Sequence, residues 1–427
     1  MSELVRGTPG LVRAVNDRAA LHLLLRQGPL TRPEISRLTG LSKPTASQVL
    51  ARLEGAGLVV GNGLRTGLPG RVPETYRVNP AAAYATAVDV TPEWIAVRAA
   101  DITGAVLGET EAPAPAGGGR EALVAALRAA LARVPTPEPP RRVVVGVQGA
   151  VDPTTGRLAY ASEEDMAAWF FPDVERTLGA ELGVPVRIEN DVNLAAVAER
   201  AHAAAGCPDF VLLWADEGLG AALVLDGRLH RGHFGGAGEV GYLPLPGAPT
   251  AREAGGPYGR HGYQELAGGD AIRELLHAHG VPGADFAETV AEAVRRAGYG
   301  ADAPPVAGAG ALPEDEEGAP TVGGEAEAAR AGLGRVAARL AAGLASIVTV
   351  VDPGLVVLAG RLCAAGGEPL RALVERELRI LAHSRARIRL SAVPGNPVLA
   401  GALDLALTAA REDVFGGPPP VGGGPVL

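Results

Sequence analysis

The sequence contains very little cysteine: only Cys207 and Cys363 occur among its 427 residues. Two cysteines cannot build a disulfide framework or a thiolate metal cluster. The chain also lacks an uncharged apolar run of about 18 residues, and its first residues contain no apolar signal core. We therefore expect a cytoplasmic protein with no membrane partner.

Lysine is nearly absent as well, and the single lysine, Lys43, lies in a part of the chain with unusual charge. Residues 1–79 contain 11 Lys and Arg against 5 Asp and Glu, a net charge of +6. The remaining residues contain 28 basic and 43 acidic side chains, a net charge of −15. A basic segment joined to an acidic body indicates a nucleic-acid-binding domain attached to a domain of another kind.

Residues 31–60 have the pattern of two short helices joined by a tight turn. Thr31 and Glu34 are spaced as a capping box, and Gly40 suits the left-handed residue that ends a helix. Ser42 and Pro44 are typical of the start of the second helix. An earlier helix is expected from about residue 18 to 27, capped by Asn16 or Asp17, after a loose arm of residues 1–10.

The second helix of this pair has the properties of a DNA recognition helix. One side is apolar, and the other carries small hydrogen-bonding side chains near its N-terminal end, which reading of the major groove requires. A strand, a turn rich in Gly and Arg, and an alternating strand then follow over residues 58–78 and predict a β wing. A helical hairpin with a merely solvated face is the alternative. The candidate DNA-binding residues are Thr31, Ser42, Lys43, Pro44, Thr45, Ser47, Gln48, Arg52, Arg65 and Arg71.

Beyond residue 80 the chain predicts an α/β fold. Apolar strands near residues 84–90, 94–100, 142–147, 184–188, 210–214 and 355–358 alternate with helices rich in Ala and Leu. Continuous apolar strands of this kind indicate sheets that are covered on both faces. We expect a winged helix-turn-helix domain over residues 1–80 and two α/β lobes over 81–415, with their boundary near 190–210 and the C-terminal helices packing back on the first lobe. Residues 301–320 are expected to be flexible and the tail, 416–427, disordered.

Four segments of this body resemble motifs of the ROK family. They are GVQGAVDPTTGRL (146–158), ENDVNLAAVAE (189–199), GLGAALVLDGRLHRGHFGGAGEVGYLPL (218–245) and DPGLVVLAGRL (352–362). The family comprises bacterial sugar kinases and sugar-responsive repressors on an actin-like, ribonuclease-H-like duplicated fold. The resemblance spans about residues 81–410. Because members with an N-terminal winged helix are transcriptional regulators, it implies a regulator with an actin-like ROK domain.

The resemblance also implies a sugar site. In kinase members an Asp beside an Asn takes a proton from a sugar hydroxyl, and Asp191 matches that base position; the alternative is that Asp191 only caps the following helix. Glu239 and Glu265 match positions that contact sugar. Carboxylates and an amide suit a polyhydroxyl ligand because they accept and donate several hydrogen bonds. The candidate effector-binding residues are Gly149, Asn190, Asp191, Glu239, Tyr242 and Glu265.

Both phosphate loops of the kinases are altered in this chain. Where the kinases have Asp-x-Gly-Gly-Thr, residues 89–92 read DVTP, and Pro92 has no N–H to donate. The second loop, normally Gly-Thr-Gly-x-Gly, reads DEGLG at 216–220, with two carboxylates where a polyanion would bind. We therefore expect no bound ATP, no catalytic residue and no efficient phosphoryl transfer.

The zinc site of the family is altered too. Tyr242 stands where the family has a His after Glu-x-Gly, and residues 255–265, GGPYGRHGYQE, contain no cysteine. We expect no metal, and we expect His261 to be a surface or loop residue. In the family this zinc segment orders a loop beside the sugar pocket, so its loss puts the usual set of sugars in doubt.

The predicted function is that of a transcriptional regulator, a repressor, that acts as a homodimer or tetramer. Two-fold symmetry of the protein implies an operator with paired half-sites. Its effector would be a sugar or sugar derivative bound between the two lobes. Two alternatives stay open: a sugar kinase with a DNA-binding appendage, and a constitutive regulator whose ROK domain only oligomerises.

Overall fold

A computed structural model describes residues 9–64, 73–115, 117–160, 166–204, 206–254, 261–299 and 324–416. The chain divides into unit 1, which consists of Met1–Val147, Asp173–Ile188 and Ala402–Leu427, and unit 2, which consists of Gln148–Pro172 and Glu189–Gly401. Several predictions fall outside the described residues: most of the N-terminal arm, Arg65 and Arg71 of the wing, the stretch at 301–320 and the tail after residue 416.

The first elements of unit 1, here called the head, form the predicted helix pair and the two strands of the wing. They are α1 (Pro9–Gln27), β1 (Leu30–Thr31), α2 (Arg32–Thr39), α3 (Lys43–Gly55), β2 (Val59–Leu64) and β3 (Glu74–Val78). β3 lies between β1 and β2 in a small antiparallel sheet. The capping box is present, because the Glu34 N–H donates to Thr31 Oγ1 and the Glu34 carboxylate accepts from the Thr31 N–H. Gly40 ends α2 with a φ of 71°, so the short-range pattern of this motif is confirmed.

Helix α1 is longer than the sequence predicts. It begins at Pro9 instead of about residue 18, and proline suits the first turn of a helix. Asp17, a predicted cap, lies inside the helix, where its Oδ1 is 2.5 Å from Nη2 of Arg52 on α3. The apolar residues of the extra turns, Leu11 and Val12, are about half exposed at 54% and 51%. Because these turns bury no apolar face, apolar periodicity did not predict that they are helical.

The hydrophobic core of the head includes the end of the C-terminal helix. Leu21 of α1 and Leu50 of α3 belong to the same buried cluster as Phe415, which ends α13 (Pro397–Phe415). The His22 ring meets the Phe415 ring edge-on, with ring centroids 6.2 Å apart. Within unit 1, the head is therefore joined to the C-terminal helix by packing.

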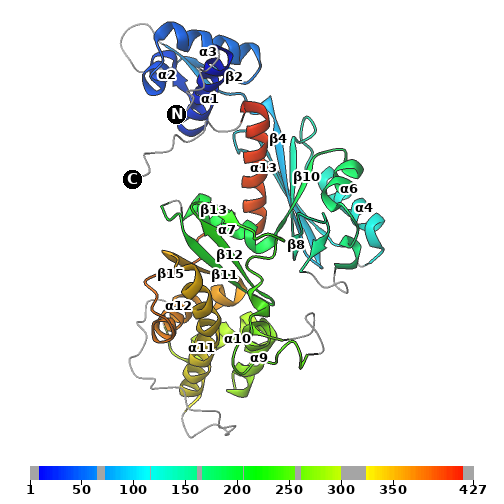
Figure 1. Ribbon diagram of the computed structural model, residues 1–427, viewed down its shortest axis with the longest axis vertical. Helices are drawn as coiled ribbons and strands as arrows, with labels where there is room; N and C mark the ends of the chain where they lie inside the picture. The colour runs from blue at the N-terminus through cyan, green and yellow to red at the C-terminus, as the bar shows by residue number, and fades with distance from the viewer. Residues whose placement is uncertain are drawn as a thin grey trace, which may run out of the picture. The chain divides into compact units, whose positions relative to one another are not determined.

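The rest of unit 1 is built on a mixed sheet with strand order β10-β7-β4-β5-β6. The strands are β4 (Tyr84–Val90), β5 (Trp94–Asp101), β6 (Val106–Pro113), β7 (Arg142–Val147) and β10 (Val186–Asn190). Helix α4 (Gly119–Ala132) packs on β5 and against α6 (Val174–Leu182). Figure 1 shows α13 beside β4, and Arg411 of α13 donates a hydrogen bond to the Ile102 carbonyl just after β5.

Unit 2 contains a second mixed sheet with both faces covered, as the apolar strands predict. Its strand order is β13 (Arg228–His230), β12 (Leu219–Leu225), β11 (Phe210–Ala215), β14 (Leu355–Ala359) and β15 (Arg387–Leu390). Alternate residues of β11 enter different clusters: Val211 and Leu213 pack with the large helical cluster, whereas Phe210 and Leu212 pack with α7 (Asp191–His202). This alternation places the two faces of the strand in two separate cores.

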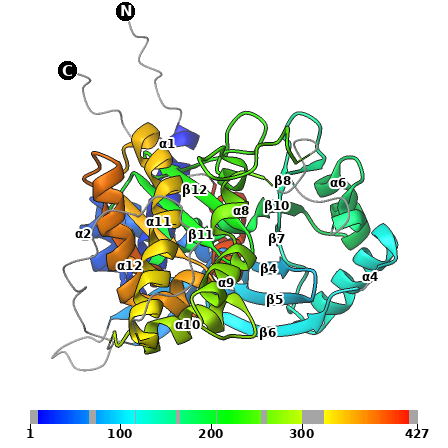
Figure 2. The same cartoon turned by 90° about the horizontal axis from the view of Figure 1, so that it is seen from below.

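The large helical cluster of unit 2 is built by one group of helices (Figure 2). The group comprises α8 (Tyr263–Ala267), α9 (Gly269–Ala278), α10 (Phe286–Arg296), α11 (Glu325–Val351) and α12 (Arg361–Leu381). By length and composition α11 could cross a membrane. Eleven of its residues, among them Leu333, Leu340 and Leu344, are instead buried in the structure, and this packing accounts for its apolar sequence.

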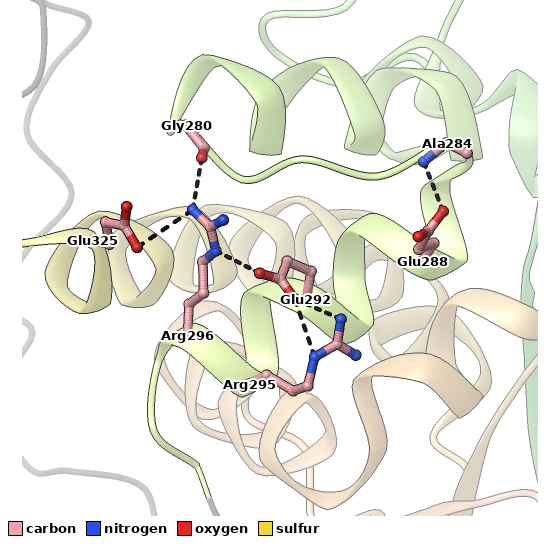
Figure 3. A network of polar contacts seen from close by, with 7 residues as sticks. All are labelled: Gly280, Ala284, Glu288, Glu292, Arg295, Arg296 and Glu325. Atoms are coloured by element: carbon pink, nitrogen blue, oxygen red, sulfur yellow. Dashed lines mark hydrogen bonds and ion pairs between the residues drawn. The ribbon is translucent and has the colours of Figure 1, made fainter.

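Polar contacts join three of these helices at one corner (Figure 3). Arg296, at the end of α10, donates to Glu292 one turn back and to the Gly280 carbonyl after α9. Its guanidinium also lies 3.7 Å from the Glu325 carboxylate at the start of α11. Hydrogen bonds from Arg296 and Arg295 lower the pKa of Glu292, which therefore remains ionised. One guanidinium thus fastens the ends of α9, α10 and α11 together.

The start of α13 approaches α7 closely within unit 2. A Cβ added at Gly401 would lie 1.9 Å from the carbonyl oxygen of Leu194 on α7, and Gly401 is buried. Only glycine leaves room for the two backbones at this distance.

We predict that Gly401→Ala lowers the free energy of unfolding by about 1–3 kcal/mol, because α13 must move away from α7. Gly334→Ala in α11 is the matched control, since its added Cβ meets nothing within 4 Å. The control should leave stability unchanged or raise it by up to about 1 kcal/mol through helix propensity. Urea denaturation of both variants measures the difference, and a Gly401→Ala protein as stable as the wild type would refute the close approach.

Candidate functional site

The N-terminal half of α3 presents most of the candidate DNA-binding residues at the surface. Ser42, Lys43, Pro44 and Gln48 are exposed, while Thr45 and Ser47 are half-buried. Ser42 caps the helix by accepting from the Thr45 N–H at 3.3 Å. On the opposite side of the helix the buried residues are Ala46, Val49, Leu50 and Leu53. Burial of this side fixes the orientation of the polar side.

Two other candidates are engaged inside the head. Thr31 is only 4% exposed, and its hydroxyl donates to the Glu34 carboxylate, so its side chain serves the helix cap and is not presented at the surface. Arg52 is held by two hydrogen bonds to Asp17 of α1, and the contact orients α3 on α1.

The N-terminus of α7 gathers the first group of candidate effector residues within unit 2. Asn190 is the helix cap: its Oδ1 accepts from the Asn193 N–H at 3.0 Å, and its Nδ2 donates to the Gly149 carbonyl at 3.2 Å. Asp191 is the first residue of the helix, and its Oδ1 accepts from the N–H of Val192 at 2.8 Å. The capping role considered for Asp191 thus belongs to Asn190. A carboxylate at this end of a helix is stabilised by the helix dipole.

Glu239 lies close enough to Asp191 to feel its charge. Burial first, and the negative charge of Asp191 second, raise the pKa of Glu239 to about 7. The loop before Glu239 is pressed onto β12, because a Cβ at Gly238 would lie 1.9 Å from the Ala221 carbonyl oxygen and Gly238 has a φ of 103°. Asp191 and Glu239 are two carboxylates close enough to affect each other's charge. As hydrogen-bond acceptors, they favour a ligand that offers hydroxyl donors.

An ion pair with a buried carboxylate, which the sequence did not reveal, connects α7 and the loop that carries Glu239. Glu189 is 5% exposed, and its Oε2 lies 2.6 Å from Nη2 of Arg231, at the start of the loop that carries Glu239. Its Oε1 accepts from Asn193 Nδ2 at 3.0 Å on α7. Glu189 and Arg231 are 42 positions apart in the sequence, so local spacing does not predict their contact. The only hint in the sequence is that an acidic residue, Glu189, directly precedes Asn190 and Asp191.

The third group consists of Tyr242, Glu265 and the neighbouring His261. Tyr242 is 42% exposed, and its ring centroid is 5.5 Å from that of His261. His261 lies in a loop, which is one of its two expected positions, but it is only 7% exposed, and its Nδ1 has no hydrogen-bond partner. Glu265 lies in α8 and is half-buried.

The donor set around α8 does not fit the zinc ion of the family. In the parts of the chain that the structure describes, no group of three or more His, Cys, Asp or Glu side chains is placed to hold a metal. The segment instead contains Tyr263, whose side chain is fully buried. A buried neutral phenol is a poor ligand for zinc, which prefers thiolate, imidazole and carboxylate.

The turn that replaces the first phosphate loop uses its own hydrogen-bond donors. Between β4 and β5, Thr91 Oγ1 accepts from the N–H groups of Glu93 and Trp94 at 3.3 and 3.1 Å. The N–H of Thr91 itself donates to the Trp94 carbonyl at 2.9 Å. These backbone donors are therefore already satisfied within the turn.

The loop that replaces the second phosphate loop contains an internal anion. The Asp216 carboxylate accepts from the backbone N–H of Arg361 at the start of α12 and from the Arg361 guanidinium, both at 2.8 Å. It also accepts from the Glu217 N–H at 2.9 Å. The positive end of α12 is thus occupied by a carboxylate of the chain itself.

Both the N-terminal residues and the body of the chain are similar to known proteins. The profile described as MarR family matches residues 15–63. The Xylose repressor of Caldicellulosiruptor bescii is 26% identical over 245 residues, which cover 56% of this chain and 61% of that protein. The chain therefore spans about three fifths of the length of the curated relatives it matches.

Solved structures share the fold. A ROK family transcriptional regulator, described as a homologue of the E. coli MLC protein, has a TM-score of 0.68 at 18% identity and covers 95% of this chain and 100% of its own. A ROK hexokinase from Thermus thermophilus has a TM-score of 0.59 at 25% identity and covers 77% of this chain and 99% of its own. The fold is that of a winged helix joined to an actin-like ROK domain. The profile of the ROK family matches residues 85–409, well over half of the sequence, and the chain belongs to the ROK family.

Proposed function

We propose that this protein is a DNA-binding transcriptional repressor whose ROK domain binds a sugar or sugar derivative. The observation that carries the proposal is the polar, exposed N-terminal half of α3 on a head whose first 79 residues have a net charge of +6. A MarR-type match over residues 15–63 and a relative named a xylose repressor support it. The protein would act in the cytoplasm as a homodimer or tetramer.

The DNA contacts follow from the shape of the head. Lys43 and Gln48 lie on the exposed side of α3 and would enter the major groove, where amide and ammonium groups contact bases or phosphates. Arg71 is the best candidate in the sequence for entry into the narrow minor groove, which attracts arginine, and Arg65 is a further candidate DNA contact; both lie outside the described residues. Two heads related by two-fold symmetry would occupy the two half-sites of an operator.

The effector site would use the two neighbouring carboxylates of unit 2. Asp191 and Glu239 can each accept hydrogen bonds from sugar hydroxyl groups, and Asn190, Gly149, Tyr242 and Glu265 would complete the polar surface. Rejection of ligands that lack a matching hydroxyl is steep when the partners are buried.

The satisfied donors of both altered phosphate loops support a role without catalysis. Thr91 occupies the backbone donors of the first loop, and Asp216 occupies the helix end at the second. A nucleotide phosphate would have to displace these groups and approach two carboxylates. The kinase with a DNA-binding appendage remains the alternative, because ROK kinases share the fold.

We predict that Gln48→Ala weakens operator binding by about 1–3 kcal/mol if the side chain contacts a base. The operator is first selected from random duplexes, and affinity is then measured by fluorescence anisotropy at fixed salt. Gln27→Ala is the matched control, because Gln27 is an exposed glutamine at the end of α1. Failure to select any duplex over random sequence would refute the DNA-binding role, and equal affinities of the two variants would refute the placement of α3.

The raised pKa of Glu239 predicts a pH dependence. Folded protein retains a proton on Glu239 that the unfolded chain loses, so this group's contribution to stability declines as pH rises from about 4.5 to about 7. Sugar affinity should rise over the upper part of that range, since the ionised carboxylate accepts more hydrogen bonds. We expect Glu239→Gln to abolish both dependences and Asp191→Asn to weaken binding at least about tenfold.

Thermal shift and calorimetry with D-xylose, D-glucose and their phosphates test this prediction between pH 5 and 8. Glu274→Gln is the control, since Glu274 is an exposed glutamate on α9 of the same unit. If no member of the panel stabilises the wild type at any pH, the constitutive regulator becomes the better description of the ROK domain.

We also predict no Asp191-dependent turnover of ATP in the presence of Mg²⁺ and the same sugars. A coupled assay of ADP release compares the wild type with Asp191→Asn. Sugar phosphate formed by the wild type and lost in the variant would establish the kinase alternative.

A further inference from the structure

Helix α8 carries Glu265 of the proposed effector site, in the segment where relatives use a zinc ion. Because the residues here do not fit zinc, something else must hold this short helix in place. Two residues that precede Glu265, Tyr263 and Gln264, make contacts in two different directions. This inference rests on the proposed effector site.

Tyr263 fastens α8 to the long core helix α11. Its side chain is fully buried, and its hydroxyl donates to the Leu340 carbonyl of α11 at 2.7 Å. A Cβ at Gly343, one turn further along α11, would lie 2.3 Å from the ring, so glycine makes the recess that receives it. Burial, with the nearby Cys363, raises the pKa of Tyr263, and the hydroxyl therefore remains a donor at any physiological pH.

Gln264 fastens the same helix to the start of β12. Its Oε1 accepts from the Leu219 N–H at 2.8 Å, and its Nε2 donates to the Glu217 carbonyl at 2.9 Å. Both the oxygen and the nitrogen of the Gln264 side-chain amide are thus hydrogen-bonded to residues 217–219, which lead into β12. The Tyr263 N–H also donates to the Leu243 carbonyl at 2.8 Å, directly after Tyr242.

These bonds connect the segments that carry Tyr242 and Glu265, two members of the site's third group. The segment that carries Glu239 and Tyr242 ends at Leu243, and α8 is bonded to it through the backbone. Tyr263 holds α8 from the core side, and Gln264 holds it from the β12 side. All of these contacts lie within unit 2.

We propose that Tyr263 and Gln264 are positioning residues that hold Glu265 and Tyr242 in the effector site by hydrogen bonds, in place of the metal used by relatives. The site is consequently independent of metal. Neither residue touches the ligand, and each acts through the placement of α8.

The test compares Tyr263→Phe, which removes only the hydroxyl, with Thr289→Val as the matched control. Thr289 is also fully buried, and its hydroxyl donates to the Asp285 carbonyl at 2.6 Å within the same unit but on α10. Amide hydrogen exchange in the full-length protein should quicken about tenfold in residues 262–267 for Tyr263→Phe and should not change there for Thr289→Val. Gln264→Ala serves as a second variant should Tyr263→Phe not fold.

Sugar affinity and metal dependence complete the experiment. Tyr263→Phe should weaken binding of whichever sugar stabilises the wild type by about fivefold to tenfold, while the control with a comparable loss of melting temperature should not. Dialysis of the wild type against EDTA should change neither the melting temperature nor exchange in α8.

The outcomes separate this inference from the proposed function. Absence of sugar binding by the wild type overturns the proposed function, and exchange and EDTA then decide the role of α8 alone. Loss of α8 protection after EDTA, or equal exchange in Tyr263→Phe and the wild type, overturns the positioning role.

Discussion

The buried carboxylate of Glu189 determines the geometry on which the candidate effector site depends. A charge with 5% exposure is costly unless it is fully paired, and Glu189 is paired by Arg231 on one oxygen and by Asn193 on the other. These partners come from the Glu239 loop and from α7. Because the pair cannot be separated without leaving an uncompensated charge, the distance between Asp191 and Glu239 is constrained. Burial first, and this proximity to Asp191 second, raise the pKa of Glu239.

At several other places, a side chain of the protein also occupies hydrogen-bonding groups to which an external ligand could bind. Thr91 fills the donors of one loop, and Asp216 fills the helix end beside another. Tyr263 and Gln264 hold α8 by hydrogen bonds to the carbonyl groups of Leu340 and Glu217. In each case a side chain of the protein satisfies polar groups that would otherwise need a ligand. The named donors of the two loops are therefore satisfied within the protein and do not need a ligand.

Features that depend on neighbours in the sequence could be predicted, whereas those that depend on distant partners could not. The capping box at Thr31 and strands such as Arg142–Val147 are defined by local spacing and appear as predicted. His261 lies in a loop as expected, but its burial depends on tertiary contacts, among them the Tyr242 ring, and was not predicted. The first turns of α1 were missed because Leu11 and Val12 are about half exposed. The Glu189–Arg231 pair needs the folded loop to exist. Amino-acid composition does not predict such contacts.

Charge explains why binding to DNA would require more than one head. Outside residues 1–79 the chain carries a net charge of −15, so a duplex is repelled by most of the molecule at distances within the Debye length, about 8 Å at physiological salt. Residues 1–79 have a net charge of +6, and the head offers the one short helix α3. Few phosphate contacts per head give weak binding that salt readily disrupts. Two heads on one duplex overcome this limit because the second binds at a high effective concentration. Under the proposed function, a protein with two heads on paired half-sites would therefore bind its operator more tightly than a single head.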